Sequence, residues 1–351
     1  MKFRLIDIIK YAIPLVVAFL LLRFYVFKEL SLADMIATFR QANYSWVIFS
    51  GIVLLFAHWS RAYRWRLLLE PLGYKPSMFR MFLAVMIGYF ANLLLPRMGE
   101  VSRCGVLNKM NKVPINAGIG TVVAERLFDV VMLLLLLCLN FLLEFNRLSE
   151  FFIQFFTDKF GSFSQISSTF YLILIVGVLF IAGIGFWAYK NQEKLWKIAI
   201  LAKVRDFFLG MWEGLVSVRK MQNKWSFIAH SFLIWIGYYF AAYLLTFALP
   251  DSKPLGWMGG LTILMMGSLG MAAPVQGGTG PYHLLVSSAL MLYGWSQEEG
   301  IILATFIWAS QTLLTIVAGG ICFVTSLFIN SAATPSVEIK DSHSQKYDSA
   351  T

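Results

Sequence analysis

The sequence predicts an all-α polytopic membrane protein with about six full transmembrane helices and two re-entrant, broken helical hairpins, arranged as an inverted repeat. Three observations predict this class: the composition, a series of long apolar segments, and two interrupted apolar segments in corresponding positions. Hydrophobic residues make up 58% of the 351 residues and charged residues only 14%, and the mean hydropathy is +0.69. Soluble domains are about 45–50% apolar and 25% charged, so the composition indicates a chain that lies in lipid.

Several apolar segments are long enough to span a bilayer. A spanning helix needs roughly 20 mostly apolar residues, and fewer where flanking side chains reach the interface. The segments that meet this criterion are 10–27, 45–61, 118–143, 170–189, 225–249 and 300–328. The first has the basic flank of a signal peptide, but no small-residue cleavage site follows it. We therefore interpret it as a retained span rather than a cleaved one.

Two further apolar segments are short and end in helix-breaking residues. Segment 78–95 runs into PRMGE, and segment 257–273 runs into PVQGGTGP before residues 282–293 resume an apolar course. Proline removes an amide donor and glycine leaves carbonyls exposed, and such backbone occurs at membrane depth only where it lines a cavity or is covered by protein. Both segments are predicted to be hairpins broken within the membrane. A surface loop between ordinary helices is the alternative for residues 92–112.

The distribution of basic residues predicts the orientation. Cytoplasmic loops of membrane proteins are rich in lysine and arginine, and most basic residues fall on one side if the amino terminus is cytoplasmic and both hairpins are re-entrant. This assignment places Arg61 and Arg64 in a cytoplasmic loop. We therefore expect a multi-pass protein of the cell membrane with both termini cytoplasmic.

The same topology predicts the domain organisation. Residues 1–330 form one transmembrane domain, with inverted halves at about 1–145 and 165–330. Residues 191–221 carry an apolar stripe at helical spacing, which predicts an interfacial helix or a connector packed on the bundle. Residues 331–351 are polar and are expected to form a disordered cytoplasmic tail.

Three charged residues stand inside the apolar segment 118–143. Glu125 and Asp129 share a helix face at a spacing of four, and Arg126 reaches Asp129 at a spacing of three. A charge near the bilayer centre costs at least about 2.5 kcal/mol, so such residues face a cavity or a partner. Two readings stay open: a functional path, or a structural ion pair that fastens this helix to the first hairpin.

The motifs LPRMGEVSRCGVL, VVAERLFDVV and PVQGGTGPYHLL together resemble the flippase-like transmembrane family, which includes the membrane region of lysylphosphatidylglycerol synthases. The resemblance covers roughly residues 10–330, and we find no segment like the soluble synthase domain. It implies transport of an anionic phospholipid or a lipid-linked precursor between leaflets. The positions that match the family's motifs are Pro96, Gly99, Glu100, Arg103, Glu125, Arg126, Asp129, Pro274, Gly277, Gly278 and Gly280.

The chain departs from the family at one place. Many members have a glutamate shortly after the second glycine cluster, where this chain has Tyr282 and His283. Either His283 titrates in place of that acid, or it is a hydrogen-bonding partner.

The residue types also predict a mechanism. A guanidinium fork and free helix amides suit phosphate, so Arg97, Arg103 and the amide end of the broken helix are expected to bind the head group of an anionic phospholipid or a polyprenyl-phosphate-type lipid. Burial favours the protonated form of a carboxyl group, so a buried acid can carry a proton during transport. The candidates are Glu100, Glu125, Asp129 and His283.

Other functional classes receive less support from the sequence. No HExxH, acid-rich metal motif or nucleophile elbow is present, so an intramembrane enzyme is not expected, and neither is a cofactor or a metal. Cys104, Cys138 and Cys322 are far apart in sequence and predict no disulfide framework. The basic residues follow loops rather than a soluble nucleic-acid-binding surface. A non-transporting accessory subunit or scaffold of a separate lipid-modifying enzyme remains the alternative to a transporter.

Overall fold

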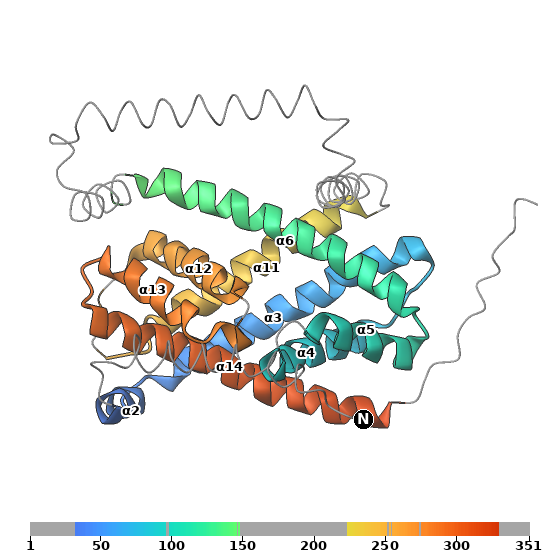
Figure 1. Ribbon diagram of the computed structural model, residues 1–351, viewed down its shortest axis with the longest axis horizontal. Helices are drawn as coiled ribbons and strands as arrows, with labels where there is room; N and C mark the ends of the chain where they lie inside the picture. The colour runs from blue at the N-terminus through green and yellow to red at the C-terminus, as the bar shows by residue number, and fades with distance from the viewer. Residues whose placement is uncertain are drawn as a thin grey trace, which may run out of the picture.

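The computed structural model describes residues 32–95, 98–145, 147, 223–250, 253, 255–273 and 275–329. These residues form helices and connecting turns, with no strand among them (Figure 1). The helices are α2 (Leu32–Arg40), α3 (Tyr44–Leu69), α4 (Met78–Leu94), α5 (Met98–Asn111), α6 (Ile115–Leu143), α11 (Lys224–Leu245), α12 (Gly256–Ala272), α13 (Pro281–Met291) and α14 (Gln297–Phe328), with 3-10 turns η2 (Glu70–Leu72) and η5 (Gln276–Gly278).

Of the helices that the structure describes, four are long and apolar enough to cross a membrane: α3 with η2, α6, α11 and α14. Large apolar side chains remain exposed on them, for example Leu134 and Leu142 on α6 and Leu313 and Ile321 on α14. Exposure of this kind suits a lipid-facing surface. The predicted spans at 10–27 and 170–189, the interfacial helix at 191–221 and the tail at 331–351 lie outside the described residues.

Helix α3 differs from its predicted span, which ended at Arg61. It continues to Leu69, and Arg61 and Arg64 are buried inside the protein. The assignment of these two arginines to a cytoplasmic loop is therefore wrong. A hydropathy criterion ends the span at the first arginine, because it takes no account of ion partners on another helix. In the folded protein such partners neutralise Arg61 and Arg64, so both can be buried within a longer α3.

The first interrupted segment folds as two adjacent helices. Helix α4 ends at Leu94, and α5 begins at Met98 and returns beside it (Figure 1). At the open end of this hairpin, where α4 begins and α5 ends, Arg80 Nη1 donates to the carbonyl oxygen of Met110 at 2.9 Å. At the turn between the two helices, the Gly99 amide donates to Asn92 Oδ1 at 2.7 Å. A Cβ at Gly99 would collide with the carbonyl oxygen of Gly88, so glycine allows the two helices to approach closely.

The second interrupted segment has the same construction. Helix α12 ends at Ala272, η5 forms the turn, and α13 returns beside α12. Gly277, Gly278 and Gly280 have φ values of 57°, 68° and 93°. Only glycine adopts such values without steric cost, which explains the cluster of glycines after the predicted break.

The two hairpins meet at their turns. Gln276 Nε2 donates to the carbonyl oxygen of Leu94 at 2.9 Å, across 182 residues of sequence. Around this point α3 packs along α11, α14 packs on α4, and α6 packs on α12. The breaks predicted from proline and glycine therefore lie beside one another in the folded protein.

Candidate functional site

Charged side chains from three helices form a network in the interior. Its members are Arg61 and Arg64 from α3, Glu100 and Arg103 from α5, and Glu125, Arg126 and Asp129 from α6. Residues 125–129 lie at the middle of the 29-residue helix α6. Charges at such a position require partners, and the network supplies them.

The centre of the network is a pair of arginines that faces a pair of carboxylates. Arg61 and Arg64, three residues apart, share one face of α3, and Glu125 and Asp129, four apart, share one face of α6. Arg61 Nη1 donates to Asp129 Oδ2 at 2.8 Å and also to Glu125, while Arg64 Nη2 donates to Asp129 Oδ1 at 2.6 Å. Each oxygen of Asp129 is thus bound by a different guanidinium group.

Arg103 is the third arginine of the network that contacts Glu125. Its Nη1 lies 3.0 Å from Glu125 Oε2, and its guanidinium carbon lies 4.6 Å from the centre of the Trp65 ring. Trp65 is itself fixed, since its Nε1 donates to Thr121 Oγ1 at 2.9 Å. A guanidinium group over an indole ring gains a cation–π interaction, so Arg103 contacts both Glu125 and Trp65.

Glu100 and Arg126 form the outer pair of the network. Arg126 Nη2 donates to Glu100 Oε1 at 2.8 Å, and Arg126 Nη1 lies at a longer 3.9 Å from Asp129 Oδ2. The side chains of Arg126 and Glu100 are 44% and 29% exposed, whereas those of Arg64 and Glu125 are fully buried. The outer pair is therefore the most exposed part of the network.

The network carries an excess of positive charge. Among the described residues, four guanidinium groups of the network contact three carboxylates. Charges in a low-dielectric interior interact more strongly than in water. The described members of the network therefore carry one net positive charge, which a single anionic group would neutralise.

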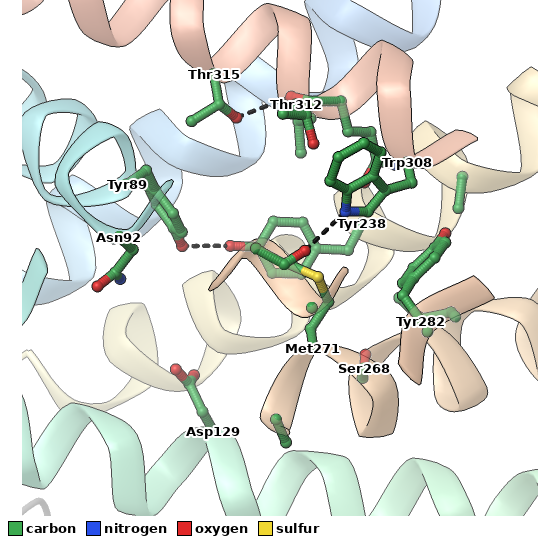
Figure 2. Close-up of a pocket in the computed structure, with 18 of the residues that line it drawn as sticks. Tyr89, Asn92, Asp129, Tyr238, Ser268, Met271, Tyr282, Trp308, Thr312 and Thr315 are labelled. Carbon is green, nitrogen blue, oxygen red and sulfur yellow. Dashed lines mark hydrogen bonds between the residues drawn. The ribbon is translucent and has the colours of Figure 1, made fainter. Parts of the chain in front are cut away.

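A cavity of about 540 Å³ lies against the network. Figure 2 shows its wall: Tyr89 and Asn92 from α4, Asp129 from α6, Met271 from α12, and Thr312 and Thr315 from α14 surround one space. Arg61, Glu100 and Arg126 also line it. The cavity therefore lies between both hairpins and the long helices, with the charged residues on one side.

Tyrosine hydroxyls connect the charged side of the cavity to its interior. Arg61 Nε donates to the hydroxyl of Tyr238 at 3.0 Å, and the hydroxyls of Tyr238 and Tyr89 are 2.9 Å apart (Figure 2). On the far side Trp308 Nε1 donates to the carbonyl oxygen of Gly277 at 2.7 Å. Apolar side chains such as Leu133 and Ile263 line much of the remainder. A wall with polar and apolar portions suits an amphipathic ligand.

The structure places the predicted site residues in three groups. Those that line the cavity are Glu100, Arg126, Asp129, Gly277 and Gly278. Those that lie behind it or in the hairpin turns are Gly99, Arg103, Glu125, Gly280 and His283. Pro96, Arg97 and Pro274 lie outside the described residues, so the expected head-group contact of Arg97 stays a prediction.

His283 occupies the first turn of α13. Its Nδ1 accepts a hydrogen bond from the Gly280 amide at 3.4 Å, and its ring lies 5.2 Å from the Trp308 ring. It is 1% exposed. Its contacts in the structure are those of a hydrogen-bonding partner at a helix start.

The network and the cavity wall also contain Arg61, Arg64, Tyr89 and Tyr238, which were not predicted from the sequence as site residues. A usable signal was present for the arginines: Glu125 and Asp129 lie in an apolar helix, and two carboxylates at this spacing require cations at matching spacing on another helix. The HWSRAYRWR stretch supplies two arginines three residues apart. The tyrosines carried no comparable signal, because aromatic residues are common throughout the chain.

Within the described ranges, no group of three or more histidine, cysteine, aspartate or glutamate side chains is arranged to hold a metal ion. The fold and the site define a polytopic helical membrane protein with a charged cavity between two broken hairpins.

Comparison with known families agrees with this class. The model of the lysylphosphatidylglycerol synthase TM region matches residues 9–320, so the chain belongs to that family. The family resemblance predicted from the hairpin motifs is confirmed.

One curated relative is the UPF0104 membrane protein MJ1595 of Methanocaldococcus jannaschii, which is 30% identical over 132 residues. The matched segment covers 37% of this chain and 39% of the relative. No solved structure matches the chain.

Proposed function

We propose that this protein moves an anionic phospholipid or a polyprenyl-phosphate-type lipid between the leaflets of the cell membrane. The head group passes through the cavity, and the acyl or prenyl chains stay in the surrounding lipid. The observation that carries the proposal is the charged wall of the cavity. There an accessible guanidinium group, Arg126, belongs to a network with more positive than negative groups.

The packing of the helices supports an inverted repeat as the architecture for this transport. Exchange of the two halves relates α3 to α11, the α4–α5 hairpin to the α12–α13 hairpin, and α6 to α14. Under this exchange the packing of α14 on α4 becomes that of α6 on α12, and both packings are present. Transporters often hold substrate where discontinuous helices of two such repeats meet.

The proposed orientation places both termini and the open end of the α4–α5 hairpin in the cytoplasm. Basic residues near that end, including Lys75, Lys109 and Lys112, support this side. A bare head-group charge would also have to cross about 30 Å of hydrocarbon, which a positively charged cavity makes less costly.

Reconstitution tests the proposal. Purified protein is placed in phosphatidylcholine vesicles that contain a trace of phosphatidylglycerol with a fluorescent label on an acyl chain. Dithionite then bleaches the label in the outer leaflet. A transporter exposes the inner-leaflet label as well, so bleaching continues beyond the outer-leaflet share.

The matched variants are Arg126→Gln and Arg66→Gln. Arg66 pairs with Glu70 at the end of α3, away from the cavity. We expect Arg126→Gln to slow transport roughly ten- to a hundredfold, because a charged hydrogen bond contributes about 1.5–3 kcal/mol. Arg66→Gln should transport like the original protein. If the original protein moves no labelled lipid, the transport proposal is wrong, and an accessory role beside a separate lipid-modifying enzyme becomes the better explanation.

A further inference from the structure

The three carboxylates of the charge network are bound to different degrees. Asp129 has a guanidinium partner on each oxygen, and Glu125 has Arg61 and Arg64 on Oε1 and Arg103 beside Oε2. In the part of the chain that the structure describes, Glu100 pairs with Arg126 alone: its Oε1 accepts from Arg126, while its buried Oε2 has no hydrogen bond. Glu125 Oε2 also lacks a hydrogen bond, but it lies 3.0 Å from Arg103 Nη1. Of the three carboxylates, Glu100 is therefore the one whose separation from its guanidinium partner costs the least free energy.

Arg126 is also the most exposed guanidinium group of the network, and it lines the cavity. Its side chain is 44% exposed, against 4% for Arg61 and 5% for Arg103. Glu100 lines the same wall of the cavity and accepts a hydrogen bond from Arg126 there. An anion that enters the cavity thus meets Arg126 with a carboxylate already bound to it.

We infer that Glu100 occupies the anion site of the empty protein, and that the phosphodiester of a lipid head group displaces it from Arg126. This inference rests on the proposed function and specifies how its site is regulated. A phosphodiester presents two non-bridging oxygens, which share one negative charge, to the planar guanidinium group and binds it in a bidentate manner. Glu100 uses only one oxygen for the same group.

The charge of the network suits a ligand with one negative charge. The described members carry four positive and three negative groups, so one bound phosphodiester makes the whole network neutral. Glu100 remains in the first turn of α5 after displacement, where the positive end of the helix dipole favours a carboxylate. The Glu100 carboxylate therefore acts as an internal competitor that keeps Arg126 paired when no lipid is bound.

A binding titration on the purified, full-length protein in detergent tests this inference. The probe is water-soluble dihexanoylphosphatidylglycerol, and dihexanoylglycerol serves as the matched lipid without phosphate. Tryptophan fluorescence reports binding, because Trp235 and Trp308 line the cavity. The variants are Glu100→Gln, which removes the competing charge at nearly constant size, and Glu70→Gln, which makes the same change outside the cavity.

Glu100→Gln should bind phosphatidylglycerol about fivefold more tightly, because a partly exposed ion pair contributes up to about 1 kcal/mol. Glu70→Gln should bind like the original protein. In the Arg126→Gln background the gain from Glu100→Gln should disappear, since competition for Arg126 no longer exists. Glu100→Asp keeps the charge but withdraws it from Arg126 by one methylene group. It should also bind more tightly, and it serves as the second variant if Glu100→Gln does not fold.

The outcomes separate the two proposals. If the original protein binds phosphatidylglycerol better than dihexanoylglycerol, but Glu100→Gln and Glu100→Asp bind it no more tightly, the competitor role is wrong and the anion site stands. If neither the original protein nor any variant prefers the phosphate-bearing lipid, both the proposed function and this inference are overturned.

Discussion

The side-chain amide of Gln276 donates a hydrogen bond to the backbone carbonyl of Leu94, so the turn of the second hairpin touches the break of the first. Leu94 is the last residue of α4, where helix carbonyls lack a partner within the helix. Gln276 supplies that partner, and Trp308 fixes the adjacent Gly277 carbonyl. The contact therefore joins the two hairpins at the edge of the cavity.

We predict that this contact must open during transport. In a variant without native cysteines, Leu94→Cys and Gln276→Cys can be linked by a short, reducible bis-methanethiosulfonate reagent. The linked protein should stop moving labelled lipid, and reductant should restore transport, because the proposed transport requires the two hairpins to move relative to one another. The single-cysteine variants with the same reagent are the controls. Full transport by the linked protein would show that the two turns stay together throughout the cycle.

The topology prediction uses exposed residues at the ends of both hairpins. Lys75 lies just before α4 and Lys109 in the last turn of α5, while Lys253 and Gln297 flank the α12–α13 hairpin. Cysteines at the first two positions should react with a membrane-impermeant maleimide only from the cytoplasm, and those at the other two only from outside.

The protein into which these single cysteines are introduced must first lose its exposed native cysteine. Cys138 is exposed and needs replacement, whereas Cys104 and Cys322 are buried. Reaction of the Lys75 and Lys109 positions from opposite sides would rule out a re-entrant first hairpin, and with it the inverted repeat.

Arg64→Met tests how strongly the buried pairs hold the bundle. The change leaves Asp129 Oδ1 without its guanidinium partner in a buried position, which should lower the free energy of unfolding by about 3–5 kcal/mol. Arg66→Met removes a partly exposed pair with Glu70 and should cost less than about 1 kcal/mol. Unfolding in mixed detergent micelles, followed by tryptophan fluorescence, measures both. Equal small losses would mean that the network contributes little to stability.

The proton-coupling prediction concerns Glu100. Of the proposed proton carriers, Glu125 and Asp129 already have guanidinium groups beside both oxygens, so a proton would have to replace an arginine. Glu100 has one free oxygen and lines the cavity. Glu100→Gln should therefore lose accumulation of lipid driven by a pH gradient while it retains lipid binding and passive exchange between leaflets.

Vesicles with and without an imposed pH gradient measure this difference, and Glu70→Gln is the control with the same loss of charge. Gradient-driven accumulation that persists in Glu100→Gln would assign Glu100 to arginine pairing alone and remove it from the coupling mechanism.

The sequence by itself determined the features that depend on local chemistry. Composition and segment length predicted a helical membrane protein. The proline and glycine signals at PRMGE and PVQGGTGP predicted the two breaks, since these residues act on the backbone within a few positions of themselves. Charged residues inside an apolar helix also marked Glu125, Arg126 and Asp129 as members of an interior site, because burial of a charge requires a partner wherever it occurs.

Only the tertiary structure decided which groups are those partners. Arg61 and Arg64 are separated from Glu125 and Asp129 by more than 60 residues, and the contact of Gln276 with Leu94 spans 182. The spacing within each helix shows which residues share a face, but helix packing alone determines which faces meet. For that reason the sequence predicted Arg61 and Arg64 to be loop residues, whereas in the folded protein they are buried and form ion pairs with Glu125 and Asp129.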